Sequence, residues 1–166
     1  MSEKRKLGII VCSTRSATGV RVDATGPMIL AWAHDEGFEV LGPHVVPDGE
    51  PVAKAFDELL AAGCAAIVTT GGTGFSSDDV TPEITSALID RPAPGIAEEI
   101  RRRGLPNTDL APLSRGVAGV SGKTFLVNLA GSKGAVKDGL EVLTVLLPHI
   151  LDQIADLHNN THKDPA

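Results

Sequence analysis

The sequence predicts a single three-layer α/β domain, in which a mostly parallel β-sheet is flanked by helices and carries a C-terminal hairpin. Apolar runs of strand length alternate with stretches in which apolar residues recur at helical spacing, a pattern typical of parallel sheets covered by helices. A length of 166 residues is enough for one domain with one substantial core. No internal repeat or interdomain linker is visible, so we expect residues 1–158 to form the domain and residues 159–166 a flexible polar tail.

The predicted strands follow from apolar composition and from turn signals. The first run is nearly continuous in apolar residues, as expected for a strand that is buried on both faces. Near the C-terminus, two short runs flank Ser121-Gly122-Lys123, which predicts the hairpin. In chain order, the predicted strands are Leu7–Ser13, Phe38–Val46, Cys64–Thr70, Val117–Val120 and Thr124–Leu129.

Helices are predicted where helical periodicity and capping signals coincide. Thr81-Pro82-Glu83 combines an N-cap residue, a first-turn proline and an acidic first turn. Pro148 falls inside the last helical stretch and is expected to kink or divide that helix. In chain order, the predicted helices are Pro27–Glu36, Val52–Ala62, Thr81–Asp90, Gly95–Arg103 and Ala135–Leu157.

The composition argues against several kinds of partner. The formal net charge of −6 is the wrong sign for tracking a nucleic-acid backbone or an anionic membrane, and four Phe, one Trp and no Tyr leave no platform for stacking bases. No apolar run reaches transmembrane length, and the chain is expected to be cytoplasmic. Cys12 and Cys64 lack C-x-x-C spacing and are interpreted as buried small hydrophobic residues. The histidines show no spacing typical of a transition-metal site.

The glycine-rich loop between the third strand and the helix at Thr81 is the strongest candidate for a ligand site. It follows the carboxyl end of a strand, where open α/β sheets bind ligands, and its glycines let a ligand approach backbone amides that suit an anion. Asp78 and Asp79 would repel a bare phosphate, so their presence indicates a bridging Mg²⁺. The alternative is an ordinary tight turn whose residues cap the helix. The loop residues expected to bind the anion are Gly71, Gly72, Thr73, Gly74, Ser76 and Ser77.

Other segments that follow predicted strands would share one rim of a parallel sheet. Ser13–Ser16 could bind a phosphate or form a polar turn, and Asn128–Lys133 opens the last helix and could hold an anion. Asp48 would lie on the same rim as Asp79, although its local sequence favours a role as the cap of the next helix. Local reasoning assigns no role to Ser114-Arg115.

The motifs in and after the glycine-rich loop resemble those of a known family. Residues 69–83 contain Thr-Thr-Gly-Gly-Thr-Gly-Phe and Asp-Val-Thr-Pro-Glu. Further matches, in the expected order, are Pro94-Gly95-Ile96, Leu113-Ser114-Arg115, Gly119–Thr124 and Val127–Ser132. Together they cover nearly the whole chain, and the chain is similar to the MogA/MoaB family of molybdopterin adenylyltransferases, including the matching domains of gephyrin-type proteins.

The resemblance implies a homotrimer that uses Mg²⁺ and ATP to transfer AMP to the terminal phosphate of molybdopterin, with release of pyrophosphate. Asp48 and Asp79 match the family's two functional acids, so the resemblance assigns both to catalysis and to Mg²⁺ binding and overrides the local preference for Asp48 as a cap. It also implies small-molecule substrates and handover of the product to a molybdenum-insertion enzyme. The matching pocket residues outside the glycine-rich loop are Ser13, Ser114, Asn128, Gly131 and Ser132.

Three departures from the family pattern concern residues of this site. Thr14 stands where the family commonly has Asp, Asp78 where it often has Arg, and Ala130 where it usually has Pro. Asp78 makes the pocket more negative, which could change the metal demand or weaken binding of the pterin phosphate. Two alternatives are therefore kept: a molybdopterin-binding protein without turnover, and a nucleotide pyrophosphate hydrolase similar to the CinA-type domain, whose loop the Ser-Asp-Asp-Val-Thr stretch resembles.

Overall fold

The structure, a computed structural model, describes residues 3–157, whose strands form one six-stranded sheet. Along the sheet the order is β2-β1-β3-β6-β5-β4. Neighbours among β2, β1, β3 and β6 pair in parallel, whereas β5 pairs antiparallel with β6 and β4 antiparallel with β5, which confirms the mostly parallel sheet and its hairpin. The strands are β1 (Lys6–Cys12), β2 (Glu39–Val46), β3 (Ala66–Thr70), β4 (Arg91–Pro92), β5 (Ala118–Ser121) and β6 (Thr124–Leu129).

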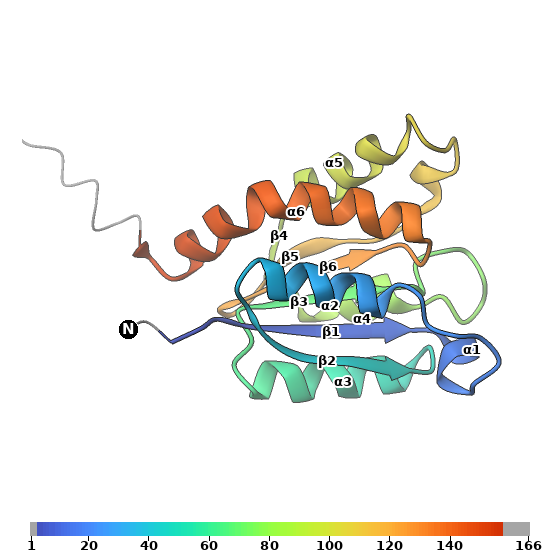
Figure 1. The fold of residues 1–166 in the computed structure, drawn as a ribbon, viewed down its shortest axis with the longest axis horizontal. Helices are drawn as coiled ribbons and strands as arrows, with labels where there is room; N and C mark the ends of the chain where they lie inside the picture. The colour runs from blue at the N-terminus through green and yellow to red at the C-terminus, as the bar shows by residue number, and fades with distance from the viewer. Residues whose placement is uncertain (1–2, 158–166) are drawn as a thin grey trace, which may run out of the picture.

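Helices cover both faces of the sheet, which confirms the predicted three layers (Figure 1). They are α1 (Thr14–Ala17), α2 (Gly26–Asp35), α3 (Glu50–Ala61), α4 (Thr81–Leu88), α5 (Pro94–Gly104), the short 3-10 helix η1 (Ala111–Leu113) and α6 (Lys133–Ile154). None of the helices in residues 3–157 combines the length and the apolar character needed to cross a membrane. The predicted tail, residues 159–166, lies outside the described residues, and the extent of the domain over residues 1–158 stays a prediction.

Two apolar cores form because consecutive residues of a strand face opposite sides of the sheet. Ile9 contributes to the core beneath α2, α5 and α6, whereas Ile10 contributes to the core beneath α3 and α4. On β6, Phe125 and Leu126 divide between the same two cores. Burial on both faces explains why the strand sequences are continuously apolar rather than alternating.

The parallel pairing brings four strand ends to one edge of the sheet. The register pairs Cys12 with Val46 and Thr70 with Leu129, and it pairs Val11, one residue before the end of β1, with Thr70. The segments that follow these four strands therefore begin side by side. In Figure 1 the arrows of β1, β2 and β6 point towards this edge, where α1 also lies.

The last helix contains Pro148 without a break. Helix α6 is continuous from its first residue to its last, so Pro148 does not divide it, and the kink that was the other expectation stays a prediction. Pro148 cannot donate to the carbonyl group of Thr144 one turn earlier, but both residues are exposed, and solvent can satisfy that carbonyl group. Leu147 and Leu151 meanwhile remain packed in the core and hold the helix against the sheet.

Short elements and one helix start also differ from the prediction. Helix α1, strand β4 and η1 are not predicted, because elements of two to four residues are too short for a periodicity to be visible. The edge position of β4 accommodates Pro92, which has no N–H to donate to a neighbouring strand. The N-cap of α4 is Val80 rather than Thr81, which is the first helical residue and is buried.

The packing of α3 against the sheet gives a test of the fold. Phe56 is fully buried in the core beneath α3 and α4, so Phe56→Ala should lower the free energy of unfolding by about 3–5 kcal/mol. The control is Val145→Ala at an exposed position of α6, where a change of about 0.5 kcal/mol or less is expected. Urea unfolding measures both, and similar costs for the two variants would contradict the assigned core.

Candidate active site

A cavity of about 860 Å³ opens at the edge where the parallel strands end. Its volume lies within the range typical of small-molecule sites. Of the thirteen residues predicted for the site, Ser76 and Ser77 do not line the cavity. The predicted residues that do line it are Ser13, Asp48, Gly71, Gly72, Thr73, Gly74, Asp79, Ser114, Asn128, Gly131 and Ser132. The three departing positions, Thr14, Asp78 and Ala130, are also in its wall.

The glycine-rich loop passes very close to its neighbours. Gly71 has φ +89°, and a Cβ atom at this position would lie 2.3 Å from the carbonyl oxygen of Cys12. Gly72 has φ +67°, and its Cβ would lie 2.2 Å from Oγ1 of Thr81 and 3.0 Å from Oδ1 of Asp48. Only glycine fits both positions. A Cβ atom would lie too close to these neighbouring atoms, and residues with a side chain rarely adopt this left-handed backbone conformation.

Asp48 is directed to α1 rather than to α3. Its Oδ2 accepts hydrogen bonds from the backbone N–H of Thr14 at 3.2 Å and from Oγ1 of Thr14 at 3.1 Å, and the N–H of Asp48 donates back to that hydroxyl. The N-cap of α3 is Gly49, without a side-chain cap bond, so the local interpretation of Asp48 as a helix cap is wrong. Thr14, one of the departures, thus holds the Asp48 carboxylate.

The other oxygen of Asp48 is free for a ligand. Asp48 Oδ1 is buried and receives no hydrogen bond from the residues described, 3–157. A buried carboxylate oxygen without a donor is costly unless a cation or a ligand pairs with it. Cys12 also faces this carboxylate, but burial raises the pKa of its thiol to about 12, so the thiol stays protonated and is not a nucleophile.

Asp79 is positioned by the loop that precedes it. Its Oδ2 accepts a hydrogen bond from the N–H of Ser76 at 2.9 Å, and its own N–H donates to the carbonyl of Ser76. Ser76 therefore contacts a candidate acid instead of the cavity. Gly74 leaves space for this carboxylate, since a Cβ there would lie 2.8 Å from Oδ2.

The donor set fits Mg²⁺ better than a metal held by protein ligands alone. No group of three or more metal-ligating side chains occurs within residues 3–157. Mg²⁺ usually binds through one or two carboxylates and completes its shell with water and substrate phosphates. Asp48, with its unpaired Oδ1, and Asp79 both line the cavity and could supply those carboxylates.

Several predicted ligands already have structural partners. Ser13 and Ser132 are the N-caps of α1 and α6, since each side chain accepts from a backbone N–H three residues later. Asn128 is buried and fully engaged: Nδ2 donates to the hydroxyl groups of Thr69 and Thr85, and Oδ1 accepts from the backbone N–H of Val117. These three residues therefore shape the cavity wall, and the Asn128 amide holds β3, α4 and the start of the hairpin together.

Arg115 holds the glycine-rich loop, a role that local sequence reasoning missed. Its Nε donates to the carbonyl of Gly74 at 2.8 Å, and Nη2 donates to the carbonyl of Asp79 at 2.7 Å. Its guanidinium also lies 5.6 Å from the centre of the Phe75 ring and pairs with Glu83, and the hydrogen bond from Arg115 lowers the pKa of that carboxyl group. The only sequence signal was the Ser-Arg motif itself, which says nothing of partners more than thirty residues earlier.

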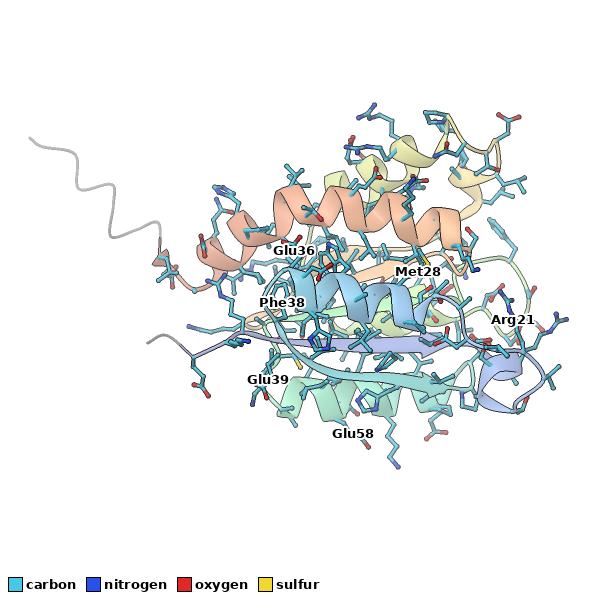
Figure 2. All side chains as sticks on the ribbon, viewed as in Figure 1. Arg21, Met28, Glu36, Phe38, Glu39 and Glu58 are labelled. Atoms are coloured by element: carbon cyan, nitrogen blue, oxygen red, sulfur yellow. The ribbon has the colours of Figure 1, made fainter. Side chains whose placement is uncertain are left out.

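The wall also contains charged and polar residues that the sequence reasoning did not select. Arg101 reaches from α5 and donates to the carbonyl groups of Ser114 and Gly116 at 3.1 and 2.9 Å. Figure 2 shows Arg21 at the same end of the molecule as α1. The unselected charged and polar residues are Arg21, Asp23, Thr25, Thr70, Arg101, Asn107, Thr108 and Asp138. Their positions depend on how helices and loops pack, which no local pattern reveals.

The fold and the cavity define a ligand-binding α/β domain that combines the amides of a glycine-rich loop with two carboxylates at the carboxyl edge of its sheet. The family described as "Probable molybdopterin binding domain" matches residues 8–150, and the chain belongs to this family.

Individual relatives agree with the family match. Molybdopterin adenylyltransferase of Haemophilus influenzae is 35% identical over 145 residues, which cover 85% of this chain and 74% of that protein. A structure of MogA superposes with a TM-score of 0.88 at 49% identity, covering 90% of this chain and 99% of that one. The molybdopterin biosynthesis enzyme MoaB from Thermus thermophilus has a TM-score of 0.82 at 41% identity, with 90% and 96% covered.

Other relatives are longer or more distant. The chain is 34% identical to the molybdenum cofactor synthesis protein cinnamon of Drosophila melanogaster and spans 28% of its length. It is 36% identical to the molybdenum cofactor biosynthesis bifunctional protein of Synechococcus elongatus and spans 49% of its length. A CinA structure from Thermoplasma acidophilum, with a TM-score of 0.64 at 19% identity, shares the fold alone.

The close approach at Gly71 can be tested against a second glycine of the same cavity wall. Gly71→Ala should lower the free energy of unfolding by about 1–3 kcal/mol, because the new Cβ meets Cys12 and the positive φ becomes strained. Gly134 lies in α6 with open space around it, so Gly134→Ala should instead raise stability by about 0.5–1 kcal/mol. Urea unfolding measures both, and a neutral Gly71→Ala variant would contradict the described loop.

The Arg115 contacts predict a local effect on the loop. In Arg115→Met the amide hydrogens of Ser76 and Asp79 should exchange faster with solvent, because the loop loses the hydrogen bonds that hold its carbonyl groups. Arg102→Met, at an exposed arginine of α5 that pairs with Glu99, is the control and should leave that exchange unchanged. Hydrogen exchange measured for each residue tests this prediction. Equal exchange rates of the Ser76 and Asp79 amides in the two variants would show that Arg115 does not hold the loop.

Proposed function

We propose that the protein is a molybdopterin adenylyltransferase, which transfers AMP from ATP to the terminal phosphate of molybdopterin and releases pyrophosphate. The observation that carries the proposal is the pairing, in one cavity, of the glycine-rich loop with Asp48 and Asp79. The unpaired, buried Oδ1 of Asp48 supports a site for a cation that is shared with a phosphorylated ligand. The names of the Haemophilus influenzae and Escherichia coli relatives, both molybdopterin adenylyltransferases, support the same activity.

The residues suggest how the reaction proceeds. Asp48 and Asp79 would hold Mg²⁺, which supplies charge neutralisation for the triphosphate and for the departing pyrophosphate. Thr14 keeps Asp48 in place through its hydroxyl and backbone N–H, and Arg115 keeps Asp79 in place through the loop. The amides of the loop position the α-phosphate.

The chemistry demands positioning more than proton transfer. An oxygen of the molybdopterin phosphate forms a bond to the α-phosphorus while the bond from that phosphorus to the bridging oxygen of pyrophosphate breaks. The nucleophile is already an anion, so no strong general base is needed. In-line placement of two anions and neutralisation of their charge therefore account for the catalysis.

The wider proposals rest on the family. The resemblance supports a homotrimer and handover of the adenylylated product to a molybdenum-insertion enzyme, and bifunctional relatives of Synechococcus elongatus and Chlorobaculum tepidum are compatible with that handover. Neither alternative activity is favoured. The likeness to CinA is one of fold, and the two acids expected for transfer both line the cavity, which a binder without turnover would not need.

The role of Asp79 gives the test of the proposal. Asp79→Asn should reduce pyrophosphate release from Mg·ATP and molybdopterin by at least about 100-fold, because charge neutralisation by a held metal is worth several kcal/mol in the transition state. Molybdopterin binding should stay largely intact. The control is Asp57→Asn on the exposed side of α3, which makes the same charge change and should keep wild-type turnover. Undiminished turnover in Asp79→Asn would remove Asp79 from the mechanism.

A further inference from the structure

The end of the cavity between α5, η1 and α6 has a chemistry different from that of the glycine-rich loop. Its wall there is largely apolar, with Ala97, Ile100 and Leu110 among the lining residues. One carboxylate, that of Asp138 in the second turn of α6, stands in this wall beside Asn107. An apolar wall with a single acid suits a flat heterocycle that presents hydrogen-bond donors at one edge.

Asp138 is buried and weakly paired. Its exposed fraction is 6%, and the side-chain amide of Asn107 is its donor, at 3.3 and 3.4 Å from the two carboxylate oxygens. Both distances exceed the usual range for N–H···O hydrogen bonds. No ion pair of residues 3–157 includes Asp138. A carboxylate with so few protein donors is costly to bury unless a ligand adds donors of its own.

The space beside this carboxylate is kept clear by a glycine. A Cβ at Gly104, the last residue of α5, would lie 3.6 Å from Oδ2 of Asp138 and 2.9 Å from Cβ of Ala111. Arg101, the cation of α5 that lines the cavity, already donates Nη1 to two backbone carbonyl groups. The wall thus provides the two carboxylate oxygens of Asp138 as hydrogen-bond acceptors and, within the described residues, places no paired cation beside them.

Two carboxylate oxygens are complementary to two adjacent N–H donors. The 2-amino-4-oxopyrimidine edge of a pterin offers such a pair, the ring N3–H and the 2-amino group. The adenine edge does not, because its amino group is flanked by ring nitrogens that accept hydrogen bonds. We infer that Asp138 binds the 2-amino-4-oxopyrimidine edge of the pterin, an inference that rests on the proposed function for its choice of ligand.

The placement along α6 agrees with this orientation. Gly131 packs against Gly71, since a Cβ at Gly131 would lie 3.4 Å from Cα of Gly71, so the start of α6 adjoins the glycine-rich loop. Asp138 lies six residues after the N-cap Ser132, a rise of about 9 Å along a helix. A pterin held at Asp138 therefore extends towards the loop, where its phosphate meets ATP.

The test replaces the two acceptor oxygens of Asp138 with the one acceptor and one donor of an asparagine amide. Asp138→Asn retains size and the contact to Asn107, but its amide offers one acceptor and one donor. At the edge that Asp138 faces, this pair is complementary to the N3–H and 2-oxo group of 2,4-dioxopteridine (lumazine) and not to the N3–H and 2-amino group of pterin. Molybdopterin affinity, measured by quenching of pterin fluorescence, should fall roughly 10- to 100-fold, as for loss of a hydrogen bond to a charged group. Displacement of molybdopterin should be stronger with pterin than with lumazine for the wild type, and stronger with lumazine for Asp138→Asn.

The control is Asp109→Asn, an exposed acid of the adjoining segment that does not line the cavity. It should keep the affinity and the preference of the wild type, and the KM for ATP should be unchanged in both variants. Unaltered molybdopterin affinity in Asp138→Asn, or the same order of the two pteridines in wild type and variant, would overturn the inference. If Asp138→Asn reverses the preference but the wild type transfers no AMP, the pterin subsite stands and the proposed function is refuted. If the wild type transfers AMP but Asp138→Asn does not reverse the preference, the proposed function stands and the subsite is refuted.

Discussion

The contact between the glycine-rich loop and the end of β1 is the constraint on which the rest of the site depends. Gly71 lies against the carbonyl group of Cys12, and Gly72 lies against Thr81 and the Asp48 carboxylate, with no room for a side chain at either position. This closeness sets the direction in which the loop leaves β3. It also brings the backbone of that loop beside Asp48, so that one cavity is shared by amides and carboxylates.

The two candidate acids are held by residues that are distant in sequence. Thr14, which follows β1, fixes one oxygen of Asp48 and leaves the other unpaired. Arg115, which precedes β5, fixes the segment that carries Asp79. A carboxylate can hold a metal ion in place only if it does not move when the ligand binds. The hydrogen bonds from Thr14 and Arg115 therefore matter as much as the acids themselves. Thr14, although a departure from the family pattern, thus has a clear structural role here.

Sequence patterns predicted what depends on local chemistry and on strand direction. Continuous apolar runs identified the buried parallel strands, and the shared edge of those strands predicted that Asp48 and Asp79 lie on one rim. The same local rules wrongly favoured a cap at Asp48, because they could not show that the partner would be Thr14, 34 residues earlier. Arg115 and Asp138 were not selected, since their surroundings arise only when α5, α6 and the glycine-rich loop pack together.

The central claim is that one cavity joins a nucleotide phosphate to a pterin phosphate. The most direct measurement follows the label from α-³²P-ATP in the presence of Mg²⁺ and molybdopterin, together with the pyrophosphate that is released. The account predicts label in an adenylylated pterin, formed in equal amount to pyrophosphate and only when molybdopterin is present. Label found as free AMP, or no consumption of ATP despite bound molybdopterin, would contradict it.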